Sequence, residues 1–422
     1  MKQSAQKRDF IERSIAFWNP GKTQSWQDMG VDLVIDRREG YFLYDYDGKR
    51  LIDIHLNGGT YNIGHRHPEV VEVMKAATTR FDIGNHHFPA IARTALAETL
   101  CALTPGNLKY TLYASAGGEA IDLALKTARS AMGKKKIVSI INAYHGHTGL
   151  AVKAGAPRFS ELFLAEDTEG EFVQVLFNDL NAMEEALRRR DVAAVIMESI
   201  PATYGFPMPA KGYLSGVKKL CERYDALYIA DEVQTGLMRS GSLWAISNYD
   251  VEPDILVTGK GISGGMYPIA CVVVSERCGA WMKKDGFGHM ATFGGAEIGC
   301  VVAMKVLEIC TRPAVVSMVG YIASYMREGL DAIREKYGDF FIGIRQHGVI
   351  LGLEFDHPIG AKIVMKHLYQ NGIWAIFSSL DPTVLQFKLG ILKNLELCQE
   401  ILYRFEKSLA SASEEAQEVP RK

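Results

Sequence analysis

The 422-residue sequence lacks the cysteine patterns that hold small secreted proteins together or bind structural zinc. Its seven cysteines are scattered, odd in number and without a Cys-x-x-Cys pair. A disulfide framework is built from an even set of cysteines, and a zinc site needs closely spaced thiols or imidazoles. The pattern therefore favours reduced thiols and a cytoplasmic location.

The chain also lacks a long apolar run and a strong charge of either sign. No stretch reaches the ~18 apolar residues of a membrane-spanning helix, and the polar N-terminus, MKQSAQKRDF, has no signal-peptide core. The formal net charge is −2, so we expect no bulk attraction to nucleic acid or to an anionic membrane. Hydrophobic residues make up 48% and charged residues 23% of the chain, which is ordinary for a soluble globular protein.

Metal ligands at suitable spacing are missing as well. His65, His67, His86 and His87 gather in one region, but no carboxylate or thiol lies at ligand spacing from them. Metal sites in proteins combine such groups at short, regular spacings. We therefore expect no metal site.

Short apolar runs that end on polar residues are what the sequence does contain. Residues 226–230 stop at Asp231, and residues 255–257 lead to Lys260 within Gly-Lys-Gly. Such runs are typical of buried parallel strands, whose carboxyl ends meet at the crevice where ligands bind. A carboxylate and an amine in one crevice suit pyridoxal phosphate, because its aldehyde forms a Schiff base with lysine and its ring nitrogen needs an acidic partner.

Other segments extend the same pattern into an α/β fold. Helical segments separate most of these strands, which predicts a doubly wound, mostly parallel central sheet with helices on both faces. Strands are also predicted at 110–114, 136–141, 192–197 (which ends at Glu198) and 268–275.

Two of the connecting turns could bind a ligand. A glycine turn at Gly117 and Gly118 leads into a helix over 118–132, whose free N–H groups and positive dipole end suit an anion. A tight turn without a ligand is an equal alternative there. Tyr144 and His145 follow the strand at 136–141, where an aromatic ring either stacks on a flat cofactor or simply packs in the core.

The two ends of the chain predict a smaller α+β domain. We expect one helix and then a loop over residues 1–30, with a turn at 18–21, and a hairpin or meander over 31–53. The polar segment 411–422 is expected to be frayed. Near the C-terminus, helices are predicted at 315–336 and 394–412, and strands at 348–355 and 383–387. We divide the chain into a large domain, 76–310, and a small domain built from 1–75 and 311–422.

A dinucleotide-binding fingerprint is present only by coincidence. Residues 259–264 fit G-x-G-x-x-G, but that motif must open a long helix and be followed by an acidic residue about 20 positions on. Here Tyr267, Pro268 and an apolar strand follow instead. We therefore set aside a nicotinamide or flavin oxidoreductase.

Taken together, the chain resembles the class III aminotransferases, a subgroup of the fold-type I pyridoxal phosphate enzymes, from about residue 40 to 355. Supporting segments are residues 64–68, 117–120 and 144–146. The most specific shared motifs are Asp231-Glu232-Val233-Gln234-Thr235-Gly236, Pro253-Asp254-Ile255 leading to Lys260, and Thr292-Phe293-Gly294-Gly295.

The resemblance implies catalytic roles for Lys260, Asp231 and Tyr144. Lys260 would form the Schiff base with pyridoxal 5'-phosphate and move protons, and Asp231 would keep the ring nitrogen protonated. Val233 would pack on one face of the ring, and Tyr144, beside His145, would lie at the other.

The remaining cofactor contacts are also implied by the resemblance. Gln234 would bond the phenolic oxygen of the ring, and Gly117 and Gly118 would hold the phosphate. Thr292 would reach the phosphate of the neighbouring subunit, because sites in this family lie at a homodimer interface. Glu198 would face the substrate side of the cofactor.

Three departures from the family pattern concern binding. Ala116-Gly117-Gly118 replaces Ser-Gly-Ser, so backbone amides must do more at the phosphate. Gly236-Leu237-Met238-Arg239 replaces Gly-Phe-Gly-Arg, so we expect a loop less free to bend. Gln386 replaces an arginine that often binds the substrate carboxylate, so the preferred donor is not expected to be a simple α-amino acid held there. The substrate-site residues we predict are Trp18, Tyr61, Glu198, Arg239 and Gln386.

The sequence thus predicts a cytoplasmic, homodimeric aminotransferase that acts on small-molecule amines or amino acids and on keto acids or aldehydes. An aminomutase, racemase or lyase of the same fold remains an alternative, because these reactions use the same cofactor residues. A non-catalytic binding protein is the alternative from another class, and the intact Lys260, Asp231 and Gln234 argue against it.

Overall fold

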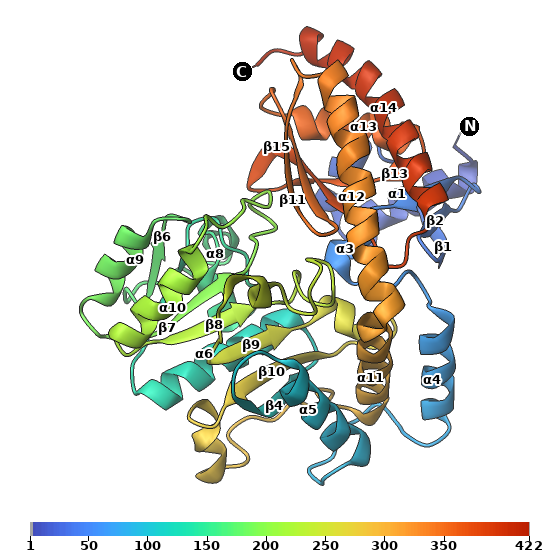
Figure 1. The fold of residues 1–422 in the computed structure, drawn as a ribbon. Coiled ribbons are helices and arrows are strands. Elements are labelled where there is room, and N and C mark those ends of the chain that lie inside the picture. The colour runs from blue at the N-terminus through green and yellow to red at the C-terminus, as the bar shows by residue number, and fades with distance from the viewer. Residues whose placement is uncertain (1–2, 422) are drawn as a thin grey trace.

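A seven-stranded sheet forms the centre of the computed structural model, which describes residues 3–421 (Figure 1). The strands β5 to β9 are parallel, whereas β10 is antiparallel to both of its neighbours. In spatial order the strands are β4 (Leu108–Ala114), β10 (Ala270–Ser275), β9 (Ile255–Thr258), β8 (Leu227–Asp231), β7 (Val192–Glu198), β5 (Lys136–Ile140) and β6 (Phe172–Val175).

Helices cover both faces of this sheet because its strands are apolar on both sides. In β7, Ala194 and Ile196 belong to one hydrophobic cluster, while Val195 and Met197 belong to the other. Successive strand residues point to opposite faces, so each face has its own core. The helices around this sheet are α5 (Ile91–Leu103), α6 (Gly117–Met132), α7 (Gly149–Ala154), α8 (Arg158–Glu161), α9 (Leu180–Leu187), α10 (Tyr213–Arg223) and α11 (Glu297–Thr311).

The register of the sheet places polar groups at one edge. Glu198, the last residue of β7, pairs with Asp231, the last residue of β8. Asp231 also pairs with Val257 near the end of β9, three residues before Lys260. Parallel pairing thus brings two carboxylates and an amine, which are far apart in sequence, to the same edge.

Two smaller sheets are built from the ends of the chain (Figure 1). The short strand β13 pairs in parallel with β3, with Ile373 opposite Ile52, so the two ends share one sheet. The first sheet contains β1 (Ile35–Glu39), β2 (Phe42–Asp45), β3 (Arg50–Asp53) and β13 (Ile373–Trp374). The second contains β11 (Phe341–His347), β12 (Ile350–Phe355), β15 (Asp381–Lys388) and β14 (Ile376–Ser378).

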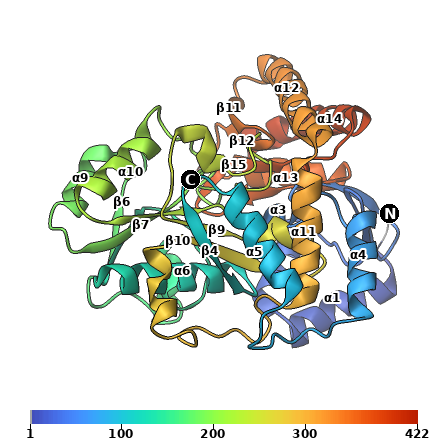
Figure 2. The same cartoon turned by 60° about the horizontal axis from the view of Figure 1, so that its bottom comes forward.

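Long helices connect and cover these sheets. In both views α11 and α12 run nearly end to end from the large sheet toward the small ones (Figures 1 and 2). Further helices are α3 (Leu56–Gly59), α4 (Pro68–Thr78), α12 (Pro313–Lys336), α13 (Gly360–Gln370) and α14 (Leu395–Glu418), with short 3₁₀ segments η1 (Ala245–Tyr249), η2 (Lys260–Ser263) and η3 (Cys278–Lys283).

The sequence prediction was wrong at both termini. The N-terminal segment contains two helices, α1 (Ala5–Phe17) and α2 (Pro20–Asp28). The predicted turn is the start of α2, where the Asn19 side chain accepts from the Lys22 amide and Pro20 takes the first position. The predicted frayed tail is helical to Glu418, because Ala412 and Ala416 continue the buried face of α14.

Two further points concern the whole chain. Within residues 3–421, none of the helices combines the length and the apolarity needed to cross a bilayer. The predicted division into a large domain, 76–310, and a small domain from both ends stays a prediction.

Candidate active site

A cavity of about 180 Å³ lies at the carboxyl ends of β7, β8 and β9. Nine of the ten residues predicted to bind the cofactor line it. The lining consists of Gly117, Gly118, Tyr144, His145, Gly146, Glu198, Asp231, Val233, Gln234 and Lys260.

Lys260 is the first residue of η2, two residues after the end of β9, and has an unusual backbone conformation. Its φ is 45°, a left-handed value that costs a non-glycine residue about 1–2 kcal/mol and that often marks functional sites. Its Nζ donates a hydrogen bond to Gln234 Oε1 at 3.1 Å. Burial lowers the pKa of the Lys260 amine, although Asp231 and Glu198 oppose that shift. A lower pKa increases the fraction of the amine that is neutral and nucleophilic.

Asp231 is a buried carboxylate held in one orientation. Its Oδ1 accepts from the Val233 amide at 3.1 Å, and its Oδ2 lies 2.7 Å from His145 Nδ1. The side chain of His145 is fully buried, so this contact is shielded from water. The arrangement fixes a negative charge on the wall of the cavity.

Glu198 lies beside Asp231, opposite it in the paired ends of β7 and β8. Its carboxylate accepts from the amides of Tyr144 at 3.1 Å and Ala202 at 3.1 Å. Burial, together with the nearby charge of Asp231, raises the pKa of Glu198 to about 7. One of the two neighbouring carboxyls is therefore easily protonated near neutral pH.

The start of α6 provides an anion cradle. Ala116 stands at the N-cap position with only a methyl group, so its side chain cannot accept from the free amides of the first turn. A Cβ on Gly117 would lie 3.0 Å from Val233, and one on Gly146 would lie 2.7 Å from the Cα of Gly118. The glycines thus allow the two turns and Val233 to approach closely around the helix N-terminus, which favours negative charge.

The loop after Gln234 bends although position 238 holds Met238 in place of the second glycine of the family pattern. Leu237 and Met238 have φ values of 63° and 68°, a left-handed conformation that costs non-glycine residues about 1–2 kcal/mol each. The expectation that this loop is less free to bend stays a prediction. Asn62 stabilises the path by donating to the Leu237 carbonyl at 2.6 Å. The bend buries Arg239, whose Nη1 donates to the Gly59 carbonyl at 2.5 Å.

Glu232 is a structural residue for which we predicted no separate role. It is 1% exposed and accepts hydrogen bonds from Ser199, from Thr235 at 2.7 Å and from the amides of Ala245 at 2.9 Å and Ile246 at 2.8 Å. It therefore ties the loop after Asp231 to the neighbouring loops.

We expect Glu232→Ala to lower the free energy of unfolding by about 3 kcal/mol or more, because several buried donors would lose their acceptor. Urea unfolding followed by circular dichroism measures this change. The control is Glu185→Ala, which removes an exposed side chain that pairs with Arg188 on the surface and should change stability by no more than ~0.5 kcal/mol. Equal effects of both substitutions would contradict this structural role.

The predicted substrate residues fall into different places. Trp18 and Tyr61 line a neighbouring cavity of about 590 Å³ together with His55. Glu198 lines the Lys260 cavity, and Arg239 packs on Gly59. These four residues therefore do not form a single pocket.

Gln386 is buried, and both polar atoms of its side chain form hydrogen bonds within the protein. Its Nε2 donates to the Ala202 carbonyl at 2.8 Å and to Ser378 Oγ at 3.0 Å. Its Oε1 accepts a hydrogen bond from Lys388. Gln386 therefore holds neighbouring groups in place.

Thr292 lies apart from the Lys260 cavity, exposed on the segment 287–293. Its carbonyl accepts from the Asn85 amide at 2.7 Å, so this segment runs beside residues 83–91. Large exposed apolar side chains gather on the two segments: Ile83, Phe88, Ile91, Phe287, Met290 and Phe293.

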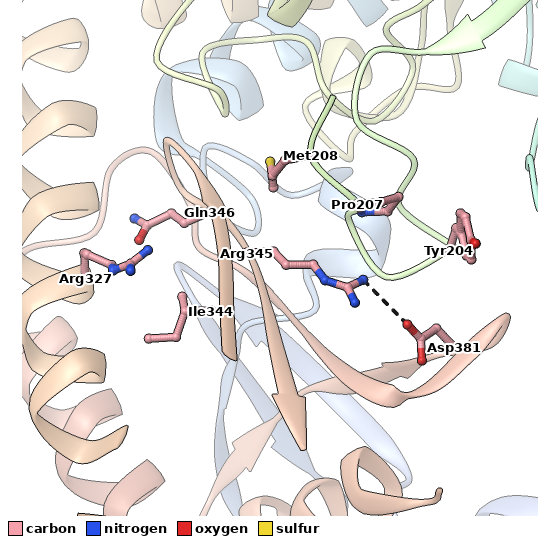
Figure 3. A pocket seen from close by; sticks show the side chains of 8 residues that line it. All are labelled: Tyr204, Pro207, Met208, Arg327, Ile344, Arg345, Gln346 and Asp381. Carbon is pink, nitrogen blue, oxygen red and sulfur yellow. Dashed lines mark ion pairs between the residues drawn. The ribbon is translucent and has the colours of Figure 1, made fainter. Parts of the chain in front are cut away.

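A separate cavity of about 530 Å³ lies between β11 and the loop after β7 (Figure 3). Arg345 points toward Asp381 at 3.5 Å and also pairs with Glu354. Arg327 pairs with Asp331 at 2.6 Å. Both arginines already have carboxylate partners, so this cavity is a weaker place for an anionic ligand than the Lys260 cavity.

Comparisons with known proteins agree with this geometry. Residues 23–409 match the family described as “Aminotransferase class-III”. An “Uncharacterized aminotransferase” of Archaeoglobus fulgidus is 42% identical over 381 residues, which cover 90% of this chain and 89% of that protein.

Solved structures show the same architecture. The ornithine aminotransferase of Toxoplasma gondii has a TM-score of 0.89 at 25% identity and covers 98% of this chain and 97% of its own. A transaminase of the marine bacterium Virgibacillus has a TM-score of 0.89 at 22% identity, covering 96% and 99%. The predicted α/β fold with a mostly parallel central sheet is therefore confirmed.

Proposed function

The chain belongs to the class III aminotransferase family, and from this premise we propose that pyridoxal 5'-phosphate is its cofactor, held in the Lys260 cavity. The geometry of that cavity carries the proposal, because it joins an amine, a fixed carboxylate and a helix N-terminus within about 180 Å³. Bound pyridoxal phosphate supplies an electron-accepting ring that stabilises negative charge on the substrate carbon.

The residues of the cavity fit the parts of this cofactor. The first turn of α6 at Gly117 and Gly118 suits its phosphate, since the N-cap methyl of Ala116 leaves the amides available. Asp231 suits the ring nitrogen, because a fixed negative charge favours the protonated form. Val233 and Tyr144 would enclose the ring between them, and Gln234 would bond its phenolic oxygen.

Lys260 would carry out the proton transfers of amino-group transfer. Its Nζ would take a proton from the substrate carbon that bears the nitrogen and return it to the cofactor side. His145 would keep Asp231 in place, while Glu198 would face the substrate. The enzyme would thereby move an amino group from an amine or amino acid donor to a carbonyl acceptor.

A panel of amine donors tests this function. Each donor is mixed with the cofactor-loaded enzyme without acceptor, and we expect conversion of the cofactor to pyridoxamine phosphate with release of one oxo product. A racemase would invert the donor without such accumulation, and a lyase or mutase would give other products. A complete lack of reaction with every amine and amino acid would favour the non-catalytic alternative.

The proposal includes a homodimer with shared sites. The exposed apolar side chains on the segments 83–91 and 287–293 support it, because contiguous apolar surface of this kind marks protein interfaces. Thr292 lies within that surface, outside its own cavity, as expected for a residue that reaches the phosphate in the partner subunit.

We expect Thr292→Val to weaken cofactor binding about ten- to a hundredfold, because a hydrogen bond to a charged phosphate contributes roughly 1.5–3 kcal/mol. Equilibrium dialysis followed by cofactor absorbance measures the change, and the urea midpoint of the cofactor-free protein should stay constant. The control is Thr78→Val, at an exposed end of α4. A strictly monomeric protein with full activity at high dilution would contradict the shared site.

The proposed location is the cytoplasm. All seven cysteines are free thiols in the described structure, and six of them are buried. Such thiols persist in a reducing compartment.

A further inference from the structure

Lys388, the last residue of β15, is a buried amine surrounded by neutral partners. Its side chain is 2% exposed. Its Nζ donates to Gln386 Oε1 and lies 3.3 Å from His55 Nδ1, and it lies 5.7 Å from the centre of the Phe206 ring. Within residues 3–421, none of its contacts at ion-pair distance is a carboxylate. A buried ammonium group is costly without an anionic partner.

One side of Lys388 is linked to the wall of the Lys260 cavity through His55. The His55 carbonyl accepts from the Gly58 amide at 3.1 Å. A Cβ on Gly58 would lie 3.1 Å from both Lys260 Cε and Gln234 Oε1. The loop that holds His55 therefore abuts the reactive amine itself.

The other side of Lys388 is linked to the opposite wall through Gln386. Gln386 donates to the Ala202 carbonyl at 2.8 Å, and the Ala202 amide donates to Glu198 Oε2 at 3.1 Å. Glu198 lines the Lys260 cavity. Lys388 thus bridges two loops that both border the proposed cofactor.

Two other basic groups, Lys260 and Arg239, act on the amine of Lys388. Burial is the main cause that holds the pKa of Lys388 well below its ordinary value, and the charges of Lys260 and Arg239 act in the same direction. Asp53 opposes them, but its Oδ2 is already paired with His65 at 2.9 Å. The amine of Lys388 is therefore held toward its neutral form, and a carboxylate placed beside it would stabilise the ammonium form.

We propose that the ammonium group of Lys388, positioned by Gln386 and His55, binds the carboxylate of the amino-acid or keto-acid substrate. The inference rests on the proposed function, since it names the substrate class of that same site. Gln386 and His55 are positioning residues: the amide oxygen of one and the imidazole of the other orient Nζ.

The chemistry of the two neighbours fits this role. Burial, followed by the charge of Lys388, lowers the pKa of His55 to about 3, so the imidazole is neutral and Nδ1 can accept from an ammonium group. Gln386 keeps its oxygen toward Nζ because its nitrogen is committed to Ala202 and Ser378. Lysine is a compact point charge without the fork of arginine, so it should tolerate carboxylates at different distances from the amine.

Binding should be coupled to proton uptake. A carboxylate beside Lys388 raises the pKa of its amine. At a pH above the pKa of the unliganded enzyme, the amine is therefore protonated in the complex but neutral without the carboxylate. The affinity for carboxylates therefore rises as the pH falls toward that pKa. An amide ligand, which has no charge, should not show this dependence.

Butyrate and butyramide, which cannot react, test the proposal on the cofactor-loaded enzyme. Calorimetry in two buffers of different ionisation enthalpy gives both affinity and proton uptake. The wild type should prefer butyrate and take up protons with it. Lys388→Met should weaken butyrate binding about ten- to a hundredfold, abolish the proton uptake and leave butyramide binding within about threefold.

Lys393→Met is the matched control. Lys393 is also buried, and burial lowers the pKa of its amine to about 7. Its Nζ lies 3.5 Å from the centre of the Tyr41 ring and, among the described residues, lacks the contacts with Gln386 and His55 that position Lys388. This variant should keep the preference for butyrate.

Donor pairs separate this inference from the proposed function. In the half-reaction without acceptor, 4-aminobutyrate and 4-aminobutanamide should both convert the cofactor in Lys388→Met, whereas the wild type should favour the acid. If Lys388→Met converts the cofactor and still prefers the acid to the amide, the inference is overturned but the proposed function stands. If none of the donors tested converts the cofactor in the wild type, the proposed function is overturned, whatever the butyrate result. If Lys388→Met does not fold, equal wild-type affinity for the two calorimetric ligands overturns the inference.

Discussion

Lys260→Ala is expected to remove the covalent link to the cofactor and to lower turnover on the order of 10⁴-fold or more. The substitution deletes the amine that both binds the cofactor aldehyde and moves the proton. The alanine variant should still bind pyridoxal phosphate, because the α6 cradle and Asp231 remain. Borohydride reduction followed by peptide mass analysis should find the cofactor on Lys260 in the wild type.

The neighbouring Lys388 should not take over in this variant, because its Nζ is held by Gln386 and His55. Lys211→Ala, at an exposed position before α10, is the control and should keep both the trapped adduct and the turnover. Trapping on another lysine of the wild type, or on none, would show that Lys260 is not the cofactor-binding residue.

The sequence predicted the reactive edge of the sheet because the relevant signals are local. Asp231 and Lys260 follow short apolar runs, and parallel pairing brings the ends of neighbouring strands together whatever their separation in the chain. The register that pairs Glu198 with Asp231 then places the carboxylates side by side. The same logic explains why Gly117 and Tyr144, which also follow strands, line the cavity.

Contacts between distant segments could not be predicted in this way. Lys388 and His55 are 333 residues apart, and their meeting depends on how the C-terminal sheet packs against the loop that contains α3. Gln386 could be compared with the arginine of related enzymes, but its three hydrogen bonds depend on Ala202, Ser378 and Lys388 meeting in space.

The turn predicted at residues 18–21 was wrong because the same residues are typical of two different structures. Asn19 and Pro20 are typical of a turn, yet they equally cap and start a helix. The structure has the helix, α2, whose Trp26 packs edge to face against Trp374, with ring centres 5.3 Å apart. A partner so distant in sequence decides between the two interpretations.

Asp231→Asn is expected to lower turnover on the order of 10³–10⁴-fold, a loss of the size that other orienting carboxylates show when converted to amides. The asparagine oxygen can still accept from the Val233 amide, so the fold and the cofactor cradle should remain. What is lost is the charge that favours a protonated ring nitrogen. Without that proton the ring is a weaker electron acceptor, and proton removal from the substrate carbon becomes slow.

Three measurements on the Asp231→Asn variant separate loss of charge from loss of structure. The urea midpoint and the cofactor content should stay close to those of the wild type, while the rate of cofactor conversion by the best donor falls. Asp191→Asn changes a carboxylate at the opposite end of β7, where it pairs with Lys136, and should alter turnover by no more than about twofold. Near-normal turnover in Asp231→Asn would reject the role of Asp231, because the variant differs from the wild type chiefly in the charge that the ring nitrogen would meet.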